Sequence, residues 1–177
     1  NSCKGDFVAI CEGDDYWQDE YKLQKQYDAL LKDRSASCCF TDAALVSHKQ
    51  IDLKHNSYLL ENGVVPKLRT YQLKEIAKQN FIPTCTVMFR KTESWNPPKT
   101  YGQSPYADWF LHIFNLLQGH AILLPEQTST YRLHEEGVFG KVSIQHRNAM
   151  KIRCLQALRK GFKSQVELNR IFRSSVQ

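Results

Sequence analysis

The fold is decided by the stretch DFVAICEGDDYW at residues 6–17. Its first half, residues 6–11, is a short apolar run with aromatic and β-branched members, which predicts a buried strand. The strand ends abruptly in a polar loop that carries Glu12, Asp14 and Asp15. Because ligands of open α/β sheets bind outside the carboxyl ends of strands, this loop is a candidate site.

Three carboxylates in so short a loop repel one another unless a positive charge lies between them. Closely spaced carboxylates suit Mg²⁺ or Mn²⁺, with a diphosphate group supplying further oxygens. The alternative is an acidic turn that caps the helix expected after it. The short loop and the flanking aromatic residues Tyr16 and Trp17 favour a site.

Strand-like and helix-like patterns alternate beyond the loop. Helical spacing of apolar residues predicts helices over residues 19–33, 71–79 and 108–117, and a helical segment from Val142 onward that is broken near Gly161. Apolar and β-branched runs predict strands over residues 37–46, 84–90, 121–124 and 128–133. Polar and proline-rich composition predicts loops over residues 47–63, with a turn at Asn62-Gly63, and 95–105. This alternation is typical of an α/β sandwich with a parallel or mixed sheet.

For two of these helices the sequence also predicts which residue caps the helix or which residues face the core. In the helix over 19–33, Asp19 is expected at the N-cap. The apolar positions that give this helix its spacing are Leu23, Tyr27, Leu30 and Leu31. In the helix over 71–79, the residues expected to face inward are Leu73, Ile76 and Ala77.

The positive charge of the chain lies in its C-terminal segment. The formal net charge is +6, but the segment from Lys141 onward has nine Lys and Arg residues against one acid, Glu167. That segment carries +8, so residues 1–140 carry −2. Such a patch attracts anionic lipid, nucleic acid or phosphorylated substrates, and a solvated helix face is an equally good interpretation.

The six cysteines and the absent motifs exclude several classes of protein. No CxxC pair and no Cys/His zinc pattern occurs, so the cysteines, including Cys11, are expected to be reduced and buried in a cytosolic protein. The chain contains no GxGxxG, GxxxxGK[ST], GxSxG or HExxH, which argues against dehydrogenases, P-loop NTPases, α/β-hydrolases and zincins. No apolar run approaches the roughly 18 residues that span a bilayer.

Two further groups of residues could carry chemistry. Asp108 opens an apolar helix behind a proline-rich loop, where it could act as a general base or simply as an N-cap. Arg132 and His134 alternate with apolar neighbours at the end of a strand, so both could point to one face and hold a phosphate or a metal. The alternative for this pair is an exposed strand end with ordinary charges.

With these groups in order, the chain resembles the family 2 glycosyltransferases, which are inverting enzymes of the GT-A fold, and most closely bacterial members of surface-polysaccharide synthesis. The resemblance covers about residues 5–140. Its motifs are residues 6–17 with the KLQKQ helix that follows, FIPTCTVMFR at residues 81–90, Asp108-Trp109, and Tyr131-Arg132-x-His134 with Gly137. Asp42, at the end of a CFTD run, also has family counterparts but no assigned role.

The resemblance implies a role for each matching residue. Asp14 and Asp15, with His134, would bind the Mg²⁺ or Mn²⁺ that bridges the diphosphate of a nucleotide sugar. Glu12 stands where the family often has Asp, and with Arg132 it would lie on the donor side. Asp108 would be the catalytic base that takes the proton of the acceptor hydroxyl. On the acceptor side the resemblance implies Thr84 and Trp109.

The resemblance also implies an organisation and a setting. Residues 1–140 would be the C-terminal portion of a GT-A domain and residues 141–177 a basic helical tail. Family members have a further N-terminal half, so the strand from Asp6 is expected at an exposed sheet edge or paired with another chain. The implied partners are a nucleotide-diphosphate sugar and a saccharide or lipid-linked acceptor, in the cytoplasm or peripherally at the membrane. The competing hypothesis is a non-catalytic module that binds an anionic membrane or nucleic acid through the tail, and nucleic acid is not expected because the tail lacks interleaved aromatic residues.

Overall fold

The computed structural model describes residues 3–47, 56–91, 98–134 and 143–175. Its strands are β1 (Phe7–Ala9), β2 (Tyr16–Trp17), β3 (Ala36–Ser47), β4 (Arg69–Tyr71), β5 (Met88–Arg90) and β6 (His120–Leu133). Its α-helices are α1 (Lys22–Lys32), α2 (Tyr58–Glu61), α3 (Leu73–Lys78), α4 (Ala107–Leu116), α5 (Ile144–Gly161) and α6 (Val166–Ser174). Two 3₁₀ turns, η1 (Thr84–Thr86) and η2 (Lys99–Gln103), complete the described elements.

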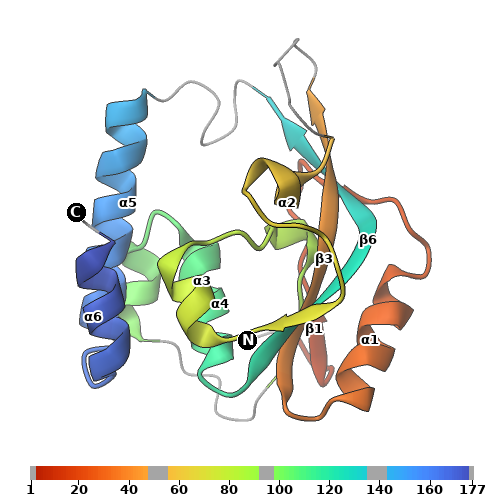
Figure 1. Cartoon of the computed structure of the whole chain (residues 1–177), viewed down its shortest axis with the longest axis horizontal. Coiled ribbons are helices and arrows are strands. Elements are labelled where there is room, and N and C mark those ends of the chain that lie inside the picture. The colour runs from red at the N-terminus through yellow and green to blue at the C-terminus, as the bar shows by residue number, and fades with distance from the viewer. Residues whose placement is uncertain (1–2, 48–55, 92–97, 135–142, 176–177) are drawn as a thin grey trace.

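The strands form one mixed sheet in the order β1-β5-β3-β6-β2, and β4 also pairs with β6. The long strands β3 and β6 are parallel, whereas the other pairs are antiparallel. In Figure 1, α1 lies on one side of this curled sheet, and the other helices lie on the opposite side or above it. The expected α/β class with a mixed sheet flanked by helices is therefore confirmed.

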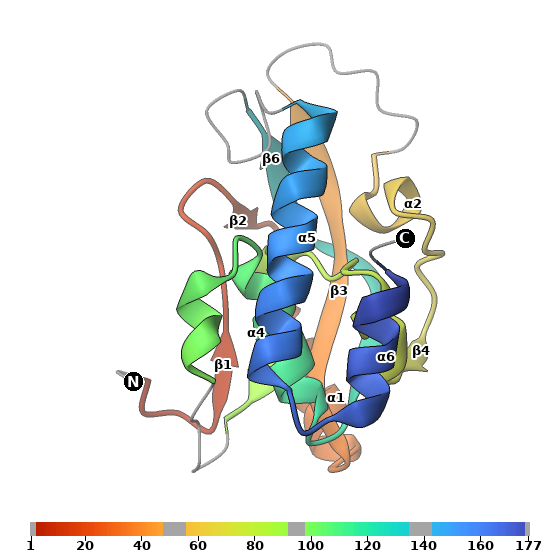
Figure 2. The ribbon, with the colours of Figure 1, turned by 90° about the vertical axis from the view of Figure 1, so that its left-hand side faces the viewer.

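The sheet separates two hydrophobic cores. Because side chains alternate along a strand, Cys38 and Phe40 of β3 face the larger core while Cys39 faces the smaller core under α1. The C-terminal helices belong to the larger core, to which they contribute Cys154, Leu155, Leu158, Phe162, Leu168 and Phe172. Figure 2 shows α5 and α6 side by side in front of α4. Gly161 lets the end of α5 approach η2 and α4 closely, since an added Cβ would lie 2.5 Å from Thr100 Oγ1 and 2.7 Å from the Phe110 ring.

The predicted strand over 84–90 and the predicted pair of strands after residue 120 need correction. The first begins as the 3₁₀ turn η1 and becomes extended only at Met88. The pair forms a single strand, β6, because register shifts opposite Phe40 and Asp42 of β3 absorb the polar residues between the two apolar runs. The loop predicted over 95–105 contains η2, and its residues 95–97 lie outside the described ranges.

The predicted helices are confirmed, but α1 buries an unexpected face. Lys22, Gln26 and Leu30 are its buried residues, whereas Leu23, Tyr27 and Leu31 are about 40% exposed. Asp19 is not the N-cap residue, although its carboxylate accepts the backbone N–H of Tyr21, which is the N-cap residue.

Two smaller expectations concern cysteines and a turn. All six cysteines are free, but Cys3 and Cys11 are exposed, so the expected burial of Cys11 is wrong. Of the predicted loop over 47–63, residues 48–55 lie outside the described ranges. The turn at Asn62-Gly63 follows α2, and Gly63 has φ +75°, a conformation that favours glycine.

Candidate functional site

The acidic loop is held against the end of β6 by its own two-residue strand. The loop turns back through a hydrogen bond from the Asp15 N–H to the Glu12 carbonyl (3.1 Å). The following strand, β2, then pairs with Ser129 and Thr130 of β6. This topology brings residues 12–15 beside a strand more than 110 positions later in the chain.

Asp14, Asp15, Arg132 and His134 meet at this junction. The backbone N–H of Arg132 donates to Asp15 Oδ1 (3.0 Å), and the Arg132 guanidinium donates to the Asp14 carbonyl. His134 Nε2 lies 2.9 Å from Asp14 Oδ2. Four of the five residues predicted for the donor side are thus brought together, and Arg132 and His134 both contact Asp14.

The two aspartates of this cluster have opposite electrostatic environments. The hydrogen bond from His134 is the main cause that lowers the pKa of Asp14. Burial is the main cause that raises the pKa of Asp15. Asp14 therefore stays charged at the surface, while the Asp15 carboxylate pays a desolvation cost that a cation would relieve.

A cleft of about 460 Å³ opens next to this cluster and holds the remaining predicted residues. Glu12, Thr84, Asp108 and Trp109 all line it. The other lining residues are Tyr58, Asn62, Gln79, Asn80, Ile82, Pro105, Tyr106, Ala107, Tyr131 and Lys151. The donor-side and acceptor-side residues therefore form two neighbouring groups, and Glu12 of the acidic loop belongs to the cleft.

Asp108 is oriented by a side chain from outside its own helix. It lies in the first turn of α4, whose N-cap is Tyr106, so the alternative that Asp108 is itself the N-cap is wrong. Asn80 Nδ2 donates to Asp108 Oδ2 (2.6 Å). This bond leaves the other carboxylate oxygen of Asp108 available to a group in the cleft.

Trp109 lines the cleft but is mostly a structural anchor. Its side chain is only 3% exposed, and its indole Nε1–H donates to the Ile76 carbonyl (2.7 Å). That bond fixes α4 to α3 and so fixes the position of Asp108. The resemblance puts Trp109 on the acceptor side, and Trp109 lines the cleft, but its burial leaves little of its side chain accessible to an acceptor.

Negative charge accumulates where the loop meets the cleft. The pKa of Glu12 is raised to about 7, first by desolvation and then by the charges of Asp15, Asp108 and Asp14. The rings of Tyr58 and Tyr131 pack 5.2 Å apart beside these acids. Desolvation raises the pKa of both phenols, so they remain neutral hydrogen-bonding groups in the cleft.

Asp14 and Asp15 could hold a divalent cation only with help from a substrate. Within the described ranges, no three His, Cys, Asp or Glu side chains converge as a metal cage. Asp15 Oδ2 is nevertheless buried with no close hydrogen-bond partner in the described ranges, although the buried Cys85 thiol interacts with this carboxyl. Since Mg²⁺ commonly takes one or two carboxylates plus phosphate oxygens and water, this donor set fits such an ion.

Several cleft residues were not predicted from the sequence. Tyr58 and Asn80 lie in segments read as loop or helix end, and Lys151 belongs to the basic C-terminal segment. No local motif signals them, because only tertiary packing brings them to Asp108. Asp42, which had no assigned role, is structural: its buried Oδ1 accepts the backbone N–H groups of Ala43 and Leu59 and so fixes α2 on β3.

Comparisons with known proteins give relatives but no family. No family model matches the chain. It is 28% identical over 142 residues to uncharacterized proteins of Mycobacterium bovis and of two strains of Mycobacterium tuberculosis. The alignment covers 78% of this chain and 38% of each relative, so the chain spans well under half the length of the relatives it matches. No helix in the described ranges is long and apolar enough to cross a membrane.

Proposed function

We propose that this chain is the part of an inverting, GT-A-type glycosyltransferase that binds the metal-diphosphate of a nucleotide sugar and positions the acceptor. One observation carries the proposal: the acidic loop is placed so that Asp14 and Asp15 meet Arg132 and His134, while Glu12 lines the same cleft as Asp108. A cation-binding group beside an oriented carboxylate is what sugar transfer from a diphosphate donor requires.

The donor would lie on the loop and β6. Mg²⁺ or Mn²⁺, held by Asp14 and Asp15, would supply Lewis-acid stabilisation of the diphosphate. The Arg132 guanidinium adds positive charge to the same side, where the leaving diphosphate gains negative charge, and His134, which contacts Asp14, would help to hold the ion. A cation would also relieve the desolvation of the buried Asp15 carboxyl.

The acceptor would lie in the cleft. Its hydroxyl oxygen forms the new bond to the anomeric carbon as the bond from that carbon to the diphosphate breaks. Asp108 takes the hydroxyl proton, and Asn80 holds the carboxylate in place for that transfer. Attack from the side opposite the diphosphate inverts the anomeric carbon, and no second carboxylate nucleophile is needed.

The first test is calorimetric titration with UDP, GDP and dTDP, each with and without Mn²⁺. We expect one nucleotide to bind only with Mn²⁺, and Asp14→Ala to abolish that binding. Asp28→Ala is the matched control, because Asp28 is an exposed aspartate of α1 whose side chain accepts from the exposed Gln24. Equal binding by Asp14→Ala and the control would remove the acidic loop from the proposed site.

If no nucleotide binds, either the proposal is wrong or part of the nucleotide site lies outside this chain. A longer form of the protein distinguishes these two explanations. Since the relatives are longer, the same nucleotides are titrated into the chain extended toward their length. Binding that appears only in the extended form places part of the nucleotide site outside this chain. No binding in either form would contradict the proposal.

A further inference from the structure

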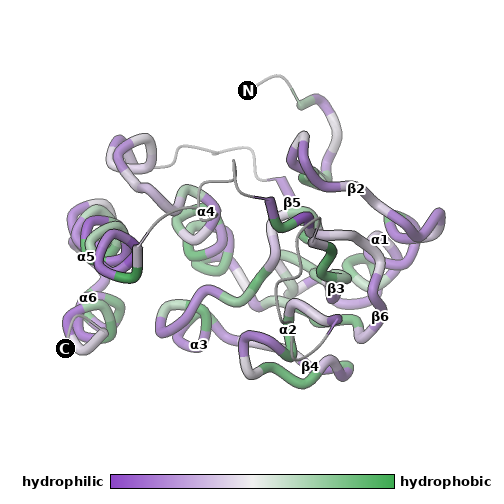
Figure 3. Tube along the Cα trace, turned by 90° about the horizontal axis from the view of Figure 1, so that it is seen from above, coloured by the Kyte–Doolittle hydropathy of each residue, from purple (hydrophilic) through white to green (hydrophobic). Residues whose placement is uncertain are grey.

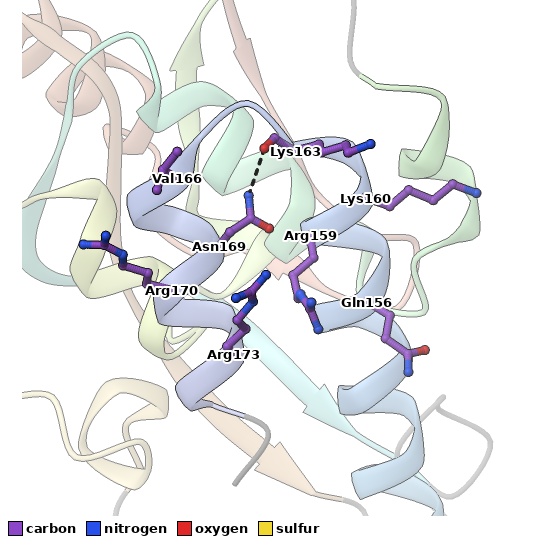
Figure 4. Close-up of a pocket in the computed structure, with 8 residues that line it drawn as sticks. All are labelled: Gln156, Arg159, Lys160, Lys163, Val166, Asn169, Arg170 and Arg173. Atoms are coloured by element: carbon purple, nitrogen blue, oxygen red, sulfur yellow. Dashed lines mark hydrogen bonds between the residues drawn. The ribbon is translucent and has the colours of Figure 1, made fainter.

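The groove between α5 and α6 carries five cationic side chains. It has a volume of about 820 Å³, and its lining is shown in Figure 4. The lining residues are Gln156, Arg159, Lys160, Lys163, Val166, Asn169, Arg170 and Arg173. They include no carboxylate and no aromatic ring, so the groove is strongly positive.

The lining follows the same helical spacing on both sides. In α6, residues 166, 169, 170 and 173 stand at i, i+3, i+4 and i+7. In α5, residues 156, 159 and 160 stand at i, i+3 and i+4, and Lys163 follows in the turn after the helix ends. Positions with this spacing share one helix face. The buried apolar stripes of the same helices, such as Leu155 and Leu168, face the core. Figure 3 shows the pair at one side of the molecule, with hydrophilic and hydrophobic residues interleaved. The two helices therefore present their polar stripes together to solvent.

This charge is not neutralised within the described part of the chain. None of the salt bridges there involves a residue of the groove. Arg159, Lys160 and Arg173 lie in last helical turns, where a positive charge is favoured by the helix dipole. At the end of α5, however, Asn169 Nδ2 already donates to the carbonyl of Phe162 (2.8 Å). The cations are thus not needed for that cap and remain available to an anion.

We propose that the groove docks this chain on an anionic lipid surface by binding lipid phosphate groups. In Figure 4, Arg159 and Arg173 lie between the two helices, while Lys160 and Arg170 extend to opposite outer sides. Charge spread over two helices matches an extended anionic surface better than one small anion. Val166, which is 65% exposed beside the groove, offers an apolar contact to the same surface.

The lining favours lipid over single-stranded nucleic acid. Single-strand binders stack bases on exposed aromatic rings between their basic residues. The aromatic residues of this segment, Phe162 and Phe172, are 4% and 0% exposed. The proposal is independent of glycosyl transfer, because the groove and the cleft have no lining residue in common.

The test is co-sedimentation with vesicles of equal parts phosphatidylglycerol and phosphatidylcholine, compared with phosphatidylcholine alone. The variant is Arg159→Gln/Arg173→Gln, and the matched control is Lys32→Gln/Arg34→Gln, which removes two exposed positive charges near the end of α1. Each cation near an anionic surface contributes roughly fivefold in affinity, so the groove variant should bind roughly 25-fold more weakly. The control should stay close to wild type.

Two further measurements test the proposal: the dependence of vesicle binding on salt, and the binding of a small anion, inorganic pyrophosphate. Binding at about 0.05 M salt should largely disappear at about 0.5 M, because exposed charges are screened. Absence of binding at low salt, or equal weakening of groove variant and control, would overturn the proposal. Saturable binding of inorganic pyrophosphate without vesicle binding would also overturn it, since the groove would then be a small-anion site. Circular dichroism of each variant checks that the helices are intact.

Discussion

Replacing Gln26 with alanine should lower the free energy of unfolding by about 3–9 kcal/mol, because three buried groups lose their partner. The Gln26 side chain is 0% exposed, and its Nε2 donates to the carbonyls of Cys39 and Thr86 (2.8 Å each). Its Oε1 accepts from the ammonium of Lys22 (2.6 Å), which is itself 1% exposed. Each buried group left unsatisfied costs about 1–3 kcal/mol, and a charged donor lies at the upper end of that range. The variant therefore loses a large part of a typical folding free energy.

Urea unfolding followed by tryptophan fluorescence measures this loss. Gln24→Ala is the control, because Gln24 is on the same helix but exposed, and its bond to Asp28 is worth only about 0.2–0.5 kcal/mol. The slope of the unfolding free energy against urea concentration should be the same in both variants and in wild type, so that a shift of the unfolding midpoint reports a change in stability. If Gln26→Ala is destabilised no more than Gln24→Ala, the assignment of a buried polar face to α1 is wrong.

Three further predictions concern titrating groups and the base. The pKa of Glu12 is raised from 4.5 to about 7, so the stabilisation from its bound proton is complete below about pH 4.5 and lost as the pH rises through 7. Glu12→Gln should accordingly match wild type at pH 4 and be more stable at pH 8 in urea unfolding. Burial lowers the pKa of Lys22 from 10.5 to about 8, so wild type should gain stability relative to Lys22→Met as the pH rises from about 8 to about 10.5. The third prediction uses the nucleotide sugar selected by titration. Asp108→Asn should lower the rate of sugar transfer by about 10²–10⁴-fold without weakening nucleotide binding, and Asn80→Ala should lower it less. Normal transfer by Asp108→Asn would exclude Asp108 as the base.

The helix α1 shows how a correct element can be predicted with the wrong face. Apolar residues occur at helical spacing, so the sequence predicts an amphipathic helix, and the helix is there. Its position over β3 and η1 is set by backbone carbonyls that need donors, and Gln26 supplies them. That demand arises from tertiary structure, so no periodicity in residues 19–33 could reveal it. Three apolar side chains are exposed as the consequence.

The candidate site likewise combines residues that could be grouped in advance with residues that only tertiary packing brings together. Asp14, Asp15, Arg132 and His134 could be grouped in advance because the resemblance assigns all four to the donor side, and the pairing of β2 with β6 brings them together. Asn80 and Lys151 could not be grouped with Asp108, since they come from a helix end and from a segment distinguished only by its charge. Positioning groups of this kind depend on packing between distant elements.

The edge of the sheet at β1 carries the last prediction. Among the described strands, β1 pairs with β5 alone. The Ile10 N–H donates to the Val87 carbonyl, and the Lys91 N–H donates to the Asp6 carbonyl. In an antiparallel pair, alternate residues of a strand direct their backbone N–H and C=O groups toward the partner strand. The backbone N–H and C=O of Ala9 therefore point away from β5, to the open side, where another strand could pair with them. We expect a second copy to do so, giving a concentration-dependent dimer in sedimentation equilibrium. Ala9→Pro removes the outward N–H and should abolish the dimer, whereas Ala9→Val keeps that donor and should retain it. A wild type that stays monomeric at all concentrations would show that this edge is left open in the isolated chain.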